Sequence, residues 1–286
     1  MDVLSVDYQS PRAPQDFAKS LRETGFAVLT NHPLPWGKIE KVYAEWREFF
    51  KSPERFNYPF DKKTQDGYVP ASLSEVAKGE VYKDIKEFYH MYYPWGRYPS
   101  FLSSATREVF EDAFELAGNL LVWIENALPP EIKNKLHRPL SSMICRERTL
   151  QRILYYPPIT GTEEVGAIRA AAHEDINLIT ILPAATAPGL EAKDAEGHWH
   201  AIKIDPKSLV INIGDMLQEA TNYYYISTSH RVVKPEGEIA GTDRLSLPHF
   251  IHAHAEDYLS PAYPTAKLYL DERLRELGLL SPEEKM

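Results

Sequence analysis

The chain has 286 residues, 43% hydrophobic and 26% charged, which is enough for a sizeable core in one large domain or two small ones. Its formal charge of −9 argues against a protein held to nucleic acid or an anionic membrane by bulk charge. Cys145 is the single cysteine, which excludes an internal disulfide. With no signal-peptide pattern and no apolar run of membrane-spanning length, we expect a soluble cytoplasmic protein.

The first half of the chain has mainly helical patterns. The stretch "PQDFAKSLRETG" predicts a short helix that ends at Gly25, and "FAVLTN" after it predicts a strand. Apolar residues recur at helical spacing in "PWGKIEKVYAEWREFFKS", and residues 53–100 have an irregular, Pro- and Tyr-rich pattern. The longest expected helix covers "SSATREVFEDAFELAGNLLVWIENAL" and ends before Pro129.

From about residue 149 the pattern changes to short strand-like runs separated by Gly, Pro, Asp and Asn. No helical segments alternate with these runs, which argues against a parallel sheet. We therefore predict an α+β protein whose core is a jelly roll, or double-stranded β-helix, with a helical region packed on it. The expected single domain spans 1–286, with a mainly helical region at 1–148 and the catalytic core at 149–286. The runs are "TLQRILYYP", "DINLITILP", "GLEAK", "HWHAIKI", "SLVINIG", "YISTSHRVV" and "RLSLPHFIHA".

A candidate metal site begins with His173 and Asp175, which project from the same side if both lie on one strand. His230 begins another expected strand and is the best candidate for a third ligand. Two histidines and one carboxylate bind iron(II) and leave positions open for a cosubstrate and oxygen. The same residue types also make a catalytic zinc site, so a zinc hydrolase is an alternative, as is a jelly-roll protein that binds without catalysis.

A second motif, Arg244 and Ser246 in "DRLSLPHF", places a guanidinium and a hydroxyl on one face of a late strand. An inward guanidinium is costly unless it meets an anion, and its planar fork suits a carboxylate. Metal ligands together with a carboxylate clamp are what a 2-oxo acid cosubstrate requires.

These motifs resemble the isopenicillin N synthase-like family of non-haem iron(II), 2-oxoglutarate-dependent oxygenases. The likeness extends to "GFAVLTNHPL", "LQRILYYPP", "GLEAKDAEGHWHAI" and "VINIGDMLQEATN", which follow in family order. It implies that His173, Asp175 and His230 bind Fe(2+). It also implies that Arg244 and Ser246 bind the distal carboxylate of 2-oxoglutarate, and that Tyr156 reaches the same end.

The resemblance implies an Fe(II)/2-oxoglutarate-dependent dioxygenase that uses O2 to oxidise, most commonly by hydroxylation, a small organic substrate, releasing succinate and CO2. It implies a small-molecule partner, while the net charge of −9 is the argument against nucleic-acid and membrane partners; the sequence does not predict an oligomeric state. The stretch "DIKEFYH" resembles bacterial members, and its Lys86, Glu87 and His90 either line the substrate side or form a solvated charged segment.

Two positions depart from the family pattern. Leu154 stands where many members have an Asn that contacts the cosubstrate, and Thr221-Asn222-Tyr223 is closer to isopenicillin N synthase itself. That enzyme uses no 2-oxoglutarate, so an oxidase of its kind is the nearest alternative.

Other polar residues have less specific patterns. His252 and His254 have metal-like spacing but are expected to be exposed loop histidines, because they follow the Arg-x-Ser strand, where the family has no ligands. Asp215 is expected to cap or close a turn. Arg152 fits either a partner of the anion or a paired strand residue.

Overall fold

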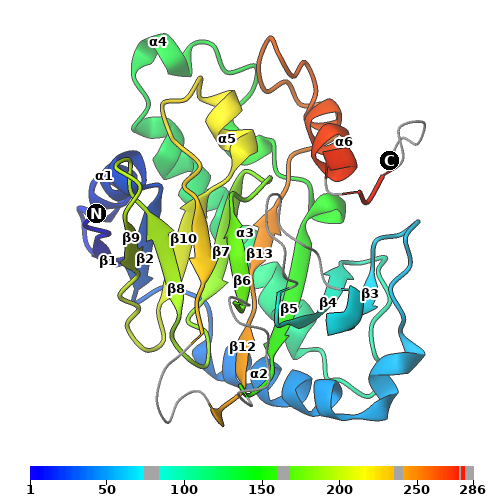
Figure 1. Ribbon diagram of the computed structural model, residues 1–286. Helices are drawn as coiled ribbons and strands as arrows, with labels where there is room; N and C mark the ends of the chain where they lie inside the picture. The colour runs from blue at the N-terminus through cyan, green and yellow to red at the C-terminus, as the bar shows by residue number, and fades with distance from the viewer. Residues whose placement is uncertain (74–83, 160–167, 235–240, 277, 281–286) are drawn as a thin grey trace.

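The computed structural model describes residues 1–73, 84–159, 168–234, 241–276 and 278–280. Within them two β-sheets lie face to face, and helices cover the outer face of the larger sheet (Figure 1). The larger sheet has the order β1-β2-β10-β7-β13-β5-β4-β3, with β12 also paired to β5, and the smaller has the order β6-β11-β8-β9. This is the predicted double-stranded β-helix.

The strands of the larger sheet are β1 (Ser5–Asp7), β2 (Phe26–Thr30), β3 (Gly67–Val69), β4 (Glu87–Tyr92), β5 (Leu150–Tyr156), β7 (Ile179–Pro183), β10 (Leu209–Ile213), β12 (Arg244–Ser246) and β13 (His249–Ile251). Those of the smaller sheet are β6 (Ala170–His173), β8 (Leu190–Lys193), β9 (Trp199–Ala201) and β11 (His230–Val232). The helices are α1 (Ala13–Thr24), α2 (Trp36–Lys51), α3 (Ala105–Asn126), α4 (Pro130–Lys133), α5 (Asp215–Ala220) and α6 (Ala266–Glu276). Short 3-10 turns cover Pro53–Asn57, Ala71–Leu73, Leu140–Ser142 and Arg146–Arg148.

The space between the two sheets is filled by side chains from both. Phe26, Val28 and Val210 of the larger sheet pack on Leu190 and Val232 of the smaller one. Alternate residues of a strand point to opposite faces, so each strand contributes every second side chain to this layer. Phe26, Leu190 and Val232 of this layer also line a narrow cavity between the sheets.

The outer face of the larger sheet is covered by α1, α2 and α3, each of which buries one apolar side. The prediction of these helices is confirmed, including the end of α1 at Gly25, whose φ of 76° is in the left-handed region. A side chain at Gly25 would also collide with Thr228. On α2, Trp46 is fully buried and its indole donates to Thr106 of α3 over 2.8 Å.

Residues 53–100, predicted to be irregular, contain β3 and β4, which extend the larger sheet beyond β5. Residues 74–83 of that stretch lie outside the described residues. The mainly helical region 1–148 therefore also supplies four strands, β1 to β4, to the same sheet as the core. The expected long strand at 244–253 is divided into β12 and β13, because Pro248 between them has no N–H to donate to a ladder.

The expectation that His173 and Asp175 share one strand face is wrong. His173 ends β6, and Asp175 lies in the connection before β7, which begins only at Ile179. The backbone of this connection bonds to the start of α5: Asp215 N donates to Asp175 O, and Met216 N donates to Asn177 O. At this position hydrogen bonds to α5 take the place of the bonds that a continuous strand would make to its neighbour.

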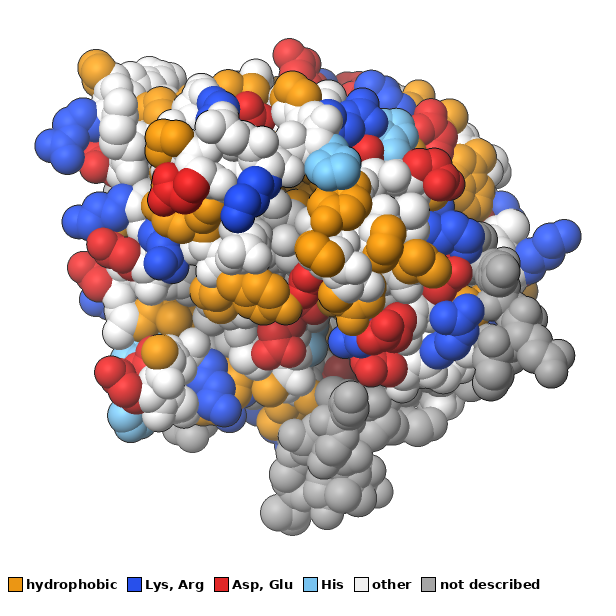
Figure 2. Space-filling view, turned by 90° about the horizontal axis from the view of Figure 1, so that it is seen from above, with side chains coloured by type: hydrophobic (Ala, Val, Ile, Leu, Met, Phe, Trp, Pro, Cys, Tyr) orange, Lys and Arg blue, Asp and Glu red, His pale blue; other side chains and the backbone are white. Residues whose placement is uncertain are grey.

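None of the helices in the described ranges combines the length and the apolar character needed to cross a membrane. Viewed from above, the surface carries Lys, Arg, Asp and Glu side chains interspersed with hydrophobic ones (Figure 2).

Candidate active site

Three predicted ligands from separate parts of the chain meet at one end of the space between the sheets. The two histidines come from the paired strands β6 and β11, where His173 lies opposite His230. The Nε2 atoms of both histidines lie 3.8 Å from Oδ1 of Asp175. The three ligand atoms all lie within 4.8 Å of one another. The smaller sheet thus supplies the imidazoles, and the connection to β7 supplies the carboxylate.

Hydrogen bonds leave one potential ligand atom open on each of these groups. Nδ1 of His173 donates to Ala171 O over 2.8 Å, and Nδ1 of His230 donates to Thr228 O over 3.1 Å, which assigns the lone pair of each ring to Nε2. Oδ2 of Asp175 accepts from Thr180 at 2.5 Å and from Asn212 at 2.8 Å, leaving Oδ1 open. Three acceptors that face one another without a proton between them fit a divalent cation.

The pKa values support the same protonation states. Burial alone would raise the pKa of Asp175, but His230, His173 and the hydrogen bonds from Thr180 and Asn212 hold it below its ordinary value. The side chain of His173 is 42% open to the cavity, yet desolvation by the surrounding walls, together with His230, lowers its pKa to about 4. Near neutral pH, His173 is therefore neutral and Asp175 is a carboxylate, as metal ligands must be.

A narrow cavity runs from the three ligands to Arg244, Ser246 and Tyr156. On the larger sheet Arg244 pairs with Tyr156, and Ser246 pairs with Leu154. Arg244 is 1% exposed; its Nε donates to Ala187 O over 2.9 Å, and its guanidinium lies 4.9 Å from the centre of the Tyr156 ring. Its Nη1 is buried and has no hydrogen-bond partner among the described residues. A buried, unsatisfied guanidinium nitrogen beside a cavity fits an anionic ligand.

A second buried arginine, Arg169, lies close to Arg244. It is fully buried, and its Nε and Nη1 find no partner in the part of the chain that the structure describes. Burial, and then the charge of Arg244, lower the pKa of Arg169. Two buried cations side by side increase the need for an anion at this end of the cavity.

A second, larger cavity of about 570 Å³ opens on the other side of His173 and Asp175. Of the residues predicted for the substrate side, Lys86 and His90 line it, and Lys86 forms an ion pair with Asp84 at 2.6 Å. Glu87 does not line it: its carboxylate accepts from Tyr68. The alternation of β4 explains the difference, because His90 and Glu87 point to opposite faces of the sheet.

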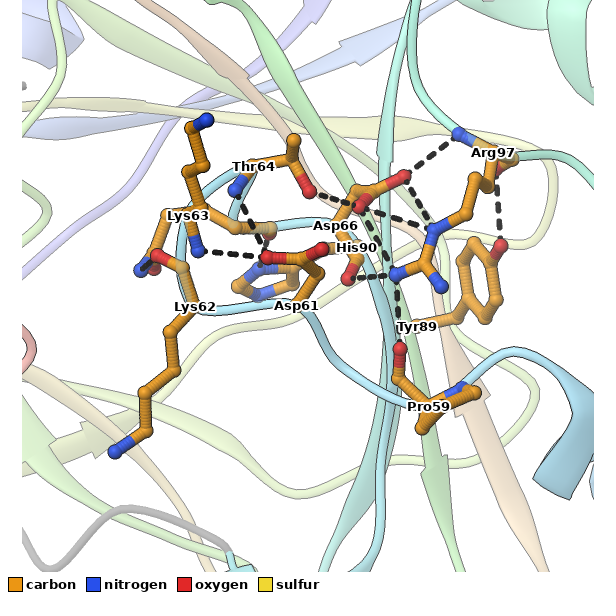
Figure 3. Close-up of polar contacts among 10 residues, drawn as sticks. Pro59, Asp61, Lys62, Lys63, Thr64, Asp66, Tyr89, His90 and Arg97 are labelled. Atoms are coloured by element: carbon orange, nitrogen blue, oxygen red, sulfur yellow. Dashed lines mark hydrogen bonds and ion pairs between the residues drawn. The ribbon is translucent and has the colours of Figure 1, made fainter.

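Thr64 and Gln65 line this cavity, and they belong to the loop at residues 59–66, which Arg97 holds in place (Figure 3). Nη2 of Arg97 donates to Pro59 O over 2.8 Å and to Asp66 Oδ1 over 3.0 Å. Nδ1 of His90 donates to Gln65 O over 3.0 Å, so β4 supports the same loop from below. Burial would raise the pKa of Asp66, but its bonds from Arg97 and Thr64 hold it below the usual range. The loop is thus fixed by charged hydrogen bonds.

The alternative metal candidates do not join the three ligands. Within the described residues, the other cluster with metal-like geometry consists of Asp194, Glu196 and His198 at the surface. His254 is exposed, as expected, but the expectation for His252 is wrong, because it is buried and lines the larger cavity. The segment after β13 turns inward, and Cys145 N bonds to His252 O over 2.8 Å. His252 directly follows β13 within the apolar stretch "FIHAHA", and that position could have indicated its burial.

Two family models match separate parts of the chain. The model of the 2OG-Fe(II) oxygenase superfamily matches residues 148–253, and that of the non-haem dioxygenase N-terminal region from morphine synthesis matches residues 4–109. Proline hydroxylase buaE of Petromyces alliaceus is 28% identical over 285 residues, covering 87% of each chain.

Two crystal structures are more similar. A Shewanella oneidensis protein assigned as an oxygenase has 50% sequence identity and a TM-score of 0.88, covering 98% of this chain and 100% of its own. A Caulobacter crescentus protein assigned to the 2OG-Fe(II) oxygenase family has 31% identity and a TM-score of 0.79, covering 96% and 99%. With these likenesses and the three converging ligand atoms, the chain belongs to the 2OG-Fe(II) oxygenase superfamily, as an Fe(II)/2-oxoglutarate-dependent dioxygenase that uses O2 to oxidise a small molecule.

Proposed function

We propose that the protein hydroxylates a small organic substrate held in the 570 Å³ cavity, with Fe(II) bound by His173, Asp175 and His230. The observation that carries this assignment is the convergence of three unprotonated ligand atoms, each oriented by a hydrogen bond on its other atom. Such second bonds fix the ring and carboxylate orientations before the metal arrives. Bound Fe(II) supplies O2 activation coupled to oxidative decarboxylation of 2-oxoglutarate to succinate and CO2.

Arg244 and Ser246 bind the distal carboxylate of 2-oxoglutarate in this proposal. The unsatisfied Nη1 of Arg244 donates to one carboxylate oxygen, and the Ser246 hydroxyl donates to the other. Tyr156 lies under the guanidinium and limits its movement. Leu154, which replaces the usual amide, is 8% exposed and adds an apolar wall instead of a donor.

The apolar walls of the narrow cavity keep water from the cosubstrate. Phe26, Leu190 and Val232 line it from the layer between the sheets. Exclusion of water strengthens the charged hydrogen bonds at Arg244, because the local dielectric constant is low.

The test measures iron and succinate in separate experiments. We expect near-stoichiometric Fe(II) under anaerobic conditions in the wild type and in His254→Ala, and loss of bound iron in each ligand variant. With O2 and 2-oxoglutarate, the wild type should form succinate. A ligand variant that keeps its iron and its turnover would remove that residue from the site. Turnover with zinc in the absence of oxygen would favour the zinc hydrolase. The ligand variants are His173→Ala, Asp175→Ala and His230→Ala.

A further inference from the structure

The larger cavity is lined by two arginines, Arg148 and Arg152, and Arg152 also lines the narrow cavity. Neither forms an ion pair with a carboxylate in the described ranges. The carboxylates that line the cavity are engaged or exposed. Asp84 pairs with Lys86, Asp215 accepts from Tyr269, Asp175 belongs to the metal ligands, Glu276 lies 3.3 Å from Arg273, and Glu147 and Glu174 are exposed.

Arg152 is held in place by neutral and apolar groups. Its Nε donates to Nε2 of His90 over 2.8 Å. Its guanidinium carbon lies 4.8 Å from the centre of the Phe88 ring and 5.4 Å from that of Phe250. Because Nδ1 of His90 donates to Gln65 O, its Nε2 is the acceptor. Burial lowers the pKa of His90 well below its ordinary value, so the ring stays neutral. These contacts fix the guanidinium without neutralising its charge.

Arg148 lies at the same wall, near Tyr92 and His252. The positive charges of Arg152 and Arg148 both act on Tyr92, whose ring stacks on Trp95 with centroids 4.8 Å apart. His252 is 7% exposed, and its Nδ1 has no hydrogen-bond partner among the described residues. This wall therefore combines two cations, an unsatisfied buried imidazole nitrogen and a flat aromatic surface.

We propose that the primary substrate is a small organic acid whose carboxylate is bound by Arg152 and Arg148, with its apolar part directed along the aromatic wall towards His173. The inference rests on the proposed function, since it assumes that the larger cavity holds the substrate. A planar carboxylate matches the guanidinium fork, and His252 can complete its hydrogen bonds. Burial of such an acid would satisfy charges that the protein otherwise leaves unpaired.

The experiment uses matched acids and methyl esters, which have nearly the same shape but differ in charge. The anaerobic Fe(II) protein with 2-oxoglutarate is titrated by calorimetry with 3-phenylpropanoate, octanoate and trans-cinnamate, and with the methyl ester of each. We expect at least one acid to bind at least about tenfold more tightly than its ester, as a charged hydrogen bond implies. In Arg152→Met and in Arg148→Met the difference should fall to about threefold or less.

Arg146→Met is the matched control. Arg146 lies on the same 3-10 turn as Arg148 but pairs with Glu111 and lies over Phe114, outside the cavity. It should keep the wild-type preference for acids. If no acid binds more tightly than its ester, or if both cavity variants keep the preference, the proposal is overturned. If Arg152→Met weakens 2-oxoglutarate binding and leaves the preference intact, Arg152 serves the cosubstrate and its assignment is overturned.

Failure of the proposed function would be seen separately. It would appear as a wild-type protein that forms no succinate, whereas the acid preference is read from binding alone.

Discussion

Replacing Arg244 tests the cosubstrate site most directly. Arg244→Met removes the charge and keeps an apolar stem, and Arg244→Lys keeps the charge but loses the planar fork. In the native protein Nε is already engaged with Ala187 O at 2.9 Å, so Nη1 is the nitrogen whose partner must come from a ligand.

The magnitude follows from this geometry. A hydrogen bond to a charged group contributes about 1.5–3 kcal/mol, and each 1.4 kcal/mol changes affinity about tenfold. Loss of the Nη1 bond together with the charge should weaken 2-oxoglutarate binding about 100-fold in Arg244→Met. Arg244→Lys should weaken it about tenfold, because one charged contact can survive. Leu154 offers no amide that could bind the cosubstrate instead, so we expect no smaller loss of 2-oxoglutarate affinity than these values.

The assay is an anaerobic calorimetric titration of the Fe(II) protein with 2-oxoglutarate. Iron content should be unchanged in both variants, since Arg244 is not among the three clustered ligands. Arg231→Lys is the control, because Arg231 also lies beside an aromatic ring but pairs with Glu191 at 2.8 Å. Equal 2-oxoglutarate affinity in Arg244→Met and the wild type would refute the carboxylate assignment.

Three further predictions concern Arg169, His249 and Gly214. Arg169→Met should leave the ligand-free Tm unchanged or raise it, because the variant removes a buried unpaired charge. The same variant should show a smaller increase in Tm on addition of 2-oxoglutarate. A lower ligand-free Tm with an unchanged increase would contradict this. Burial lowers the pKa of His249 to about 4. As the pH falls from 6.5 to about 4, the histidine is protonated in the unfolded chain but stays neutral in the folded chain, so the folded state loses stability. Urea unfolding should therefore show up to about 3 kcal/mol of stability lost across that window in the wild type and less in His249→Gln, where an equal loss would count against the assignment. Gly214→Ala should lower both Tm and iron affinity, since a Cβ there would collide with Asn177 beside Asp175, whereas Gly37→Ala, with nothing within 4 Å of its Cβ, should do neither.

The helices could be predicted from the sequence because their signals are local. The apolar positions of α2 recur at helical spacing, and Ile39, Val42 and Trp46 are all buried. Gly25 ends α1 because its own backbone conformation is the signal. Most strands from β5 onward were equally predictable, because Gly, Pro and Asp separate short apolar runs, but β6 (Ala170–His173) is not among the predicted runs.

The pairing partners were harder to predict because they depend on distant residues. β4 runs beside β5 with His90 opposite Arg152, a contact between residues about 60 positions apart that no local pattern contains. Asp175 leaves the strand because its connection bonds to the start of α5, where Asp215 N donates to Asp175 O and Met216 N donates to Asn177 O. The residue types of the metal site were therefore predictable, but the turn that presents its carboxylate was not.

Both cavities have positively charged arginines at their walls, although the chain as a whole is negatively charged. With a net charge of −9, long-range electrostatics disfavour the approach of an anion. Yet Arg169 and Arg244 are buried beside the narrow cavity, and Arg148 and Arg152 line the larger one, with no ion pair for any of them in the described segments. Their desolvation is a cost in the ligand-free protein that bound anions would offset. Affinity for acids must then come from short, shielded contacts, which salt screens weakly. Such placement cannot be inferred from composition, because only the fold determines which arginines lack a carboxylate.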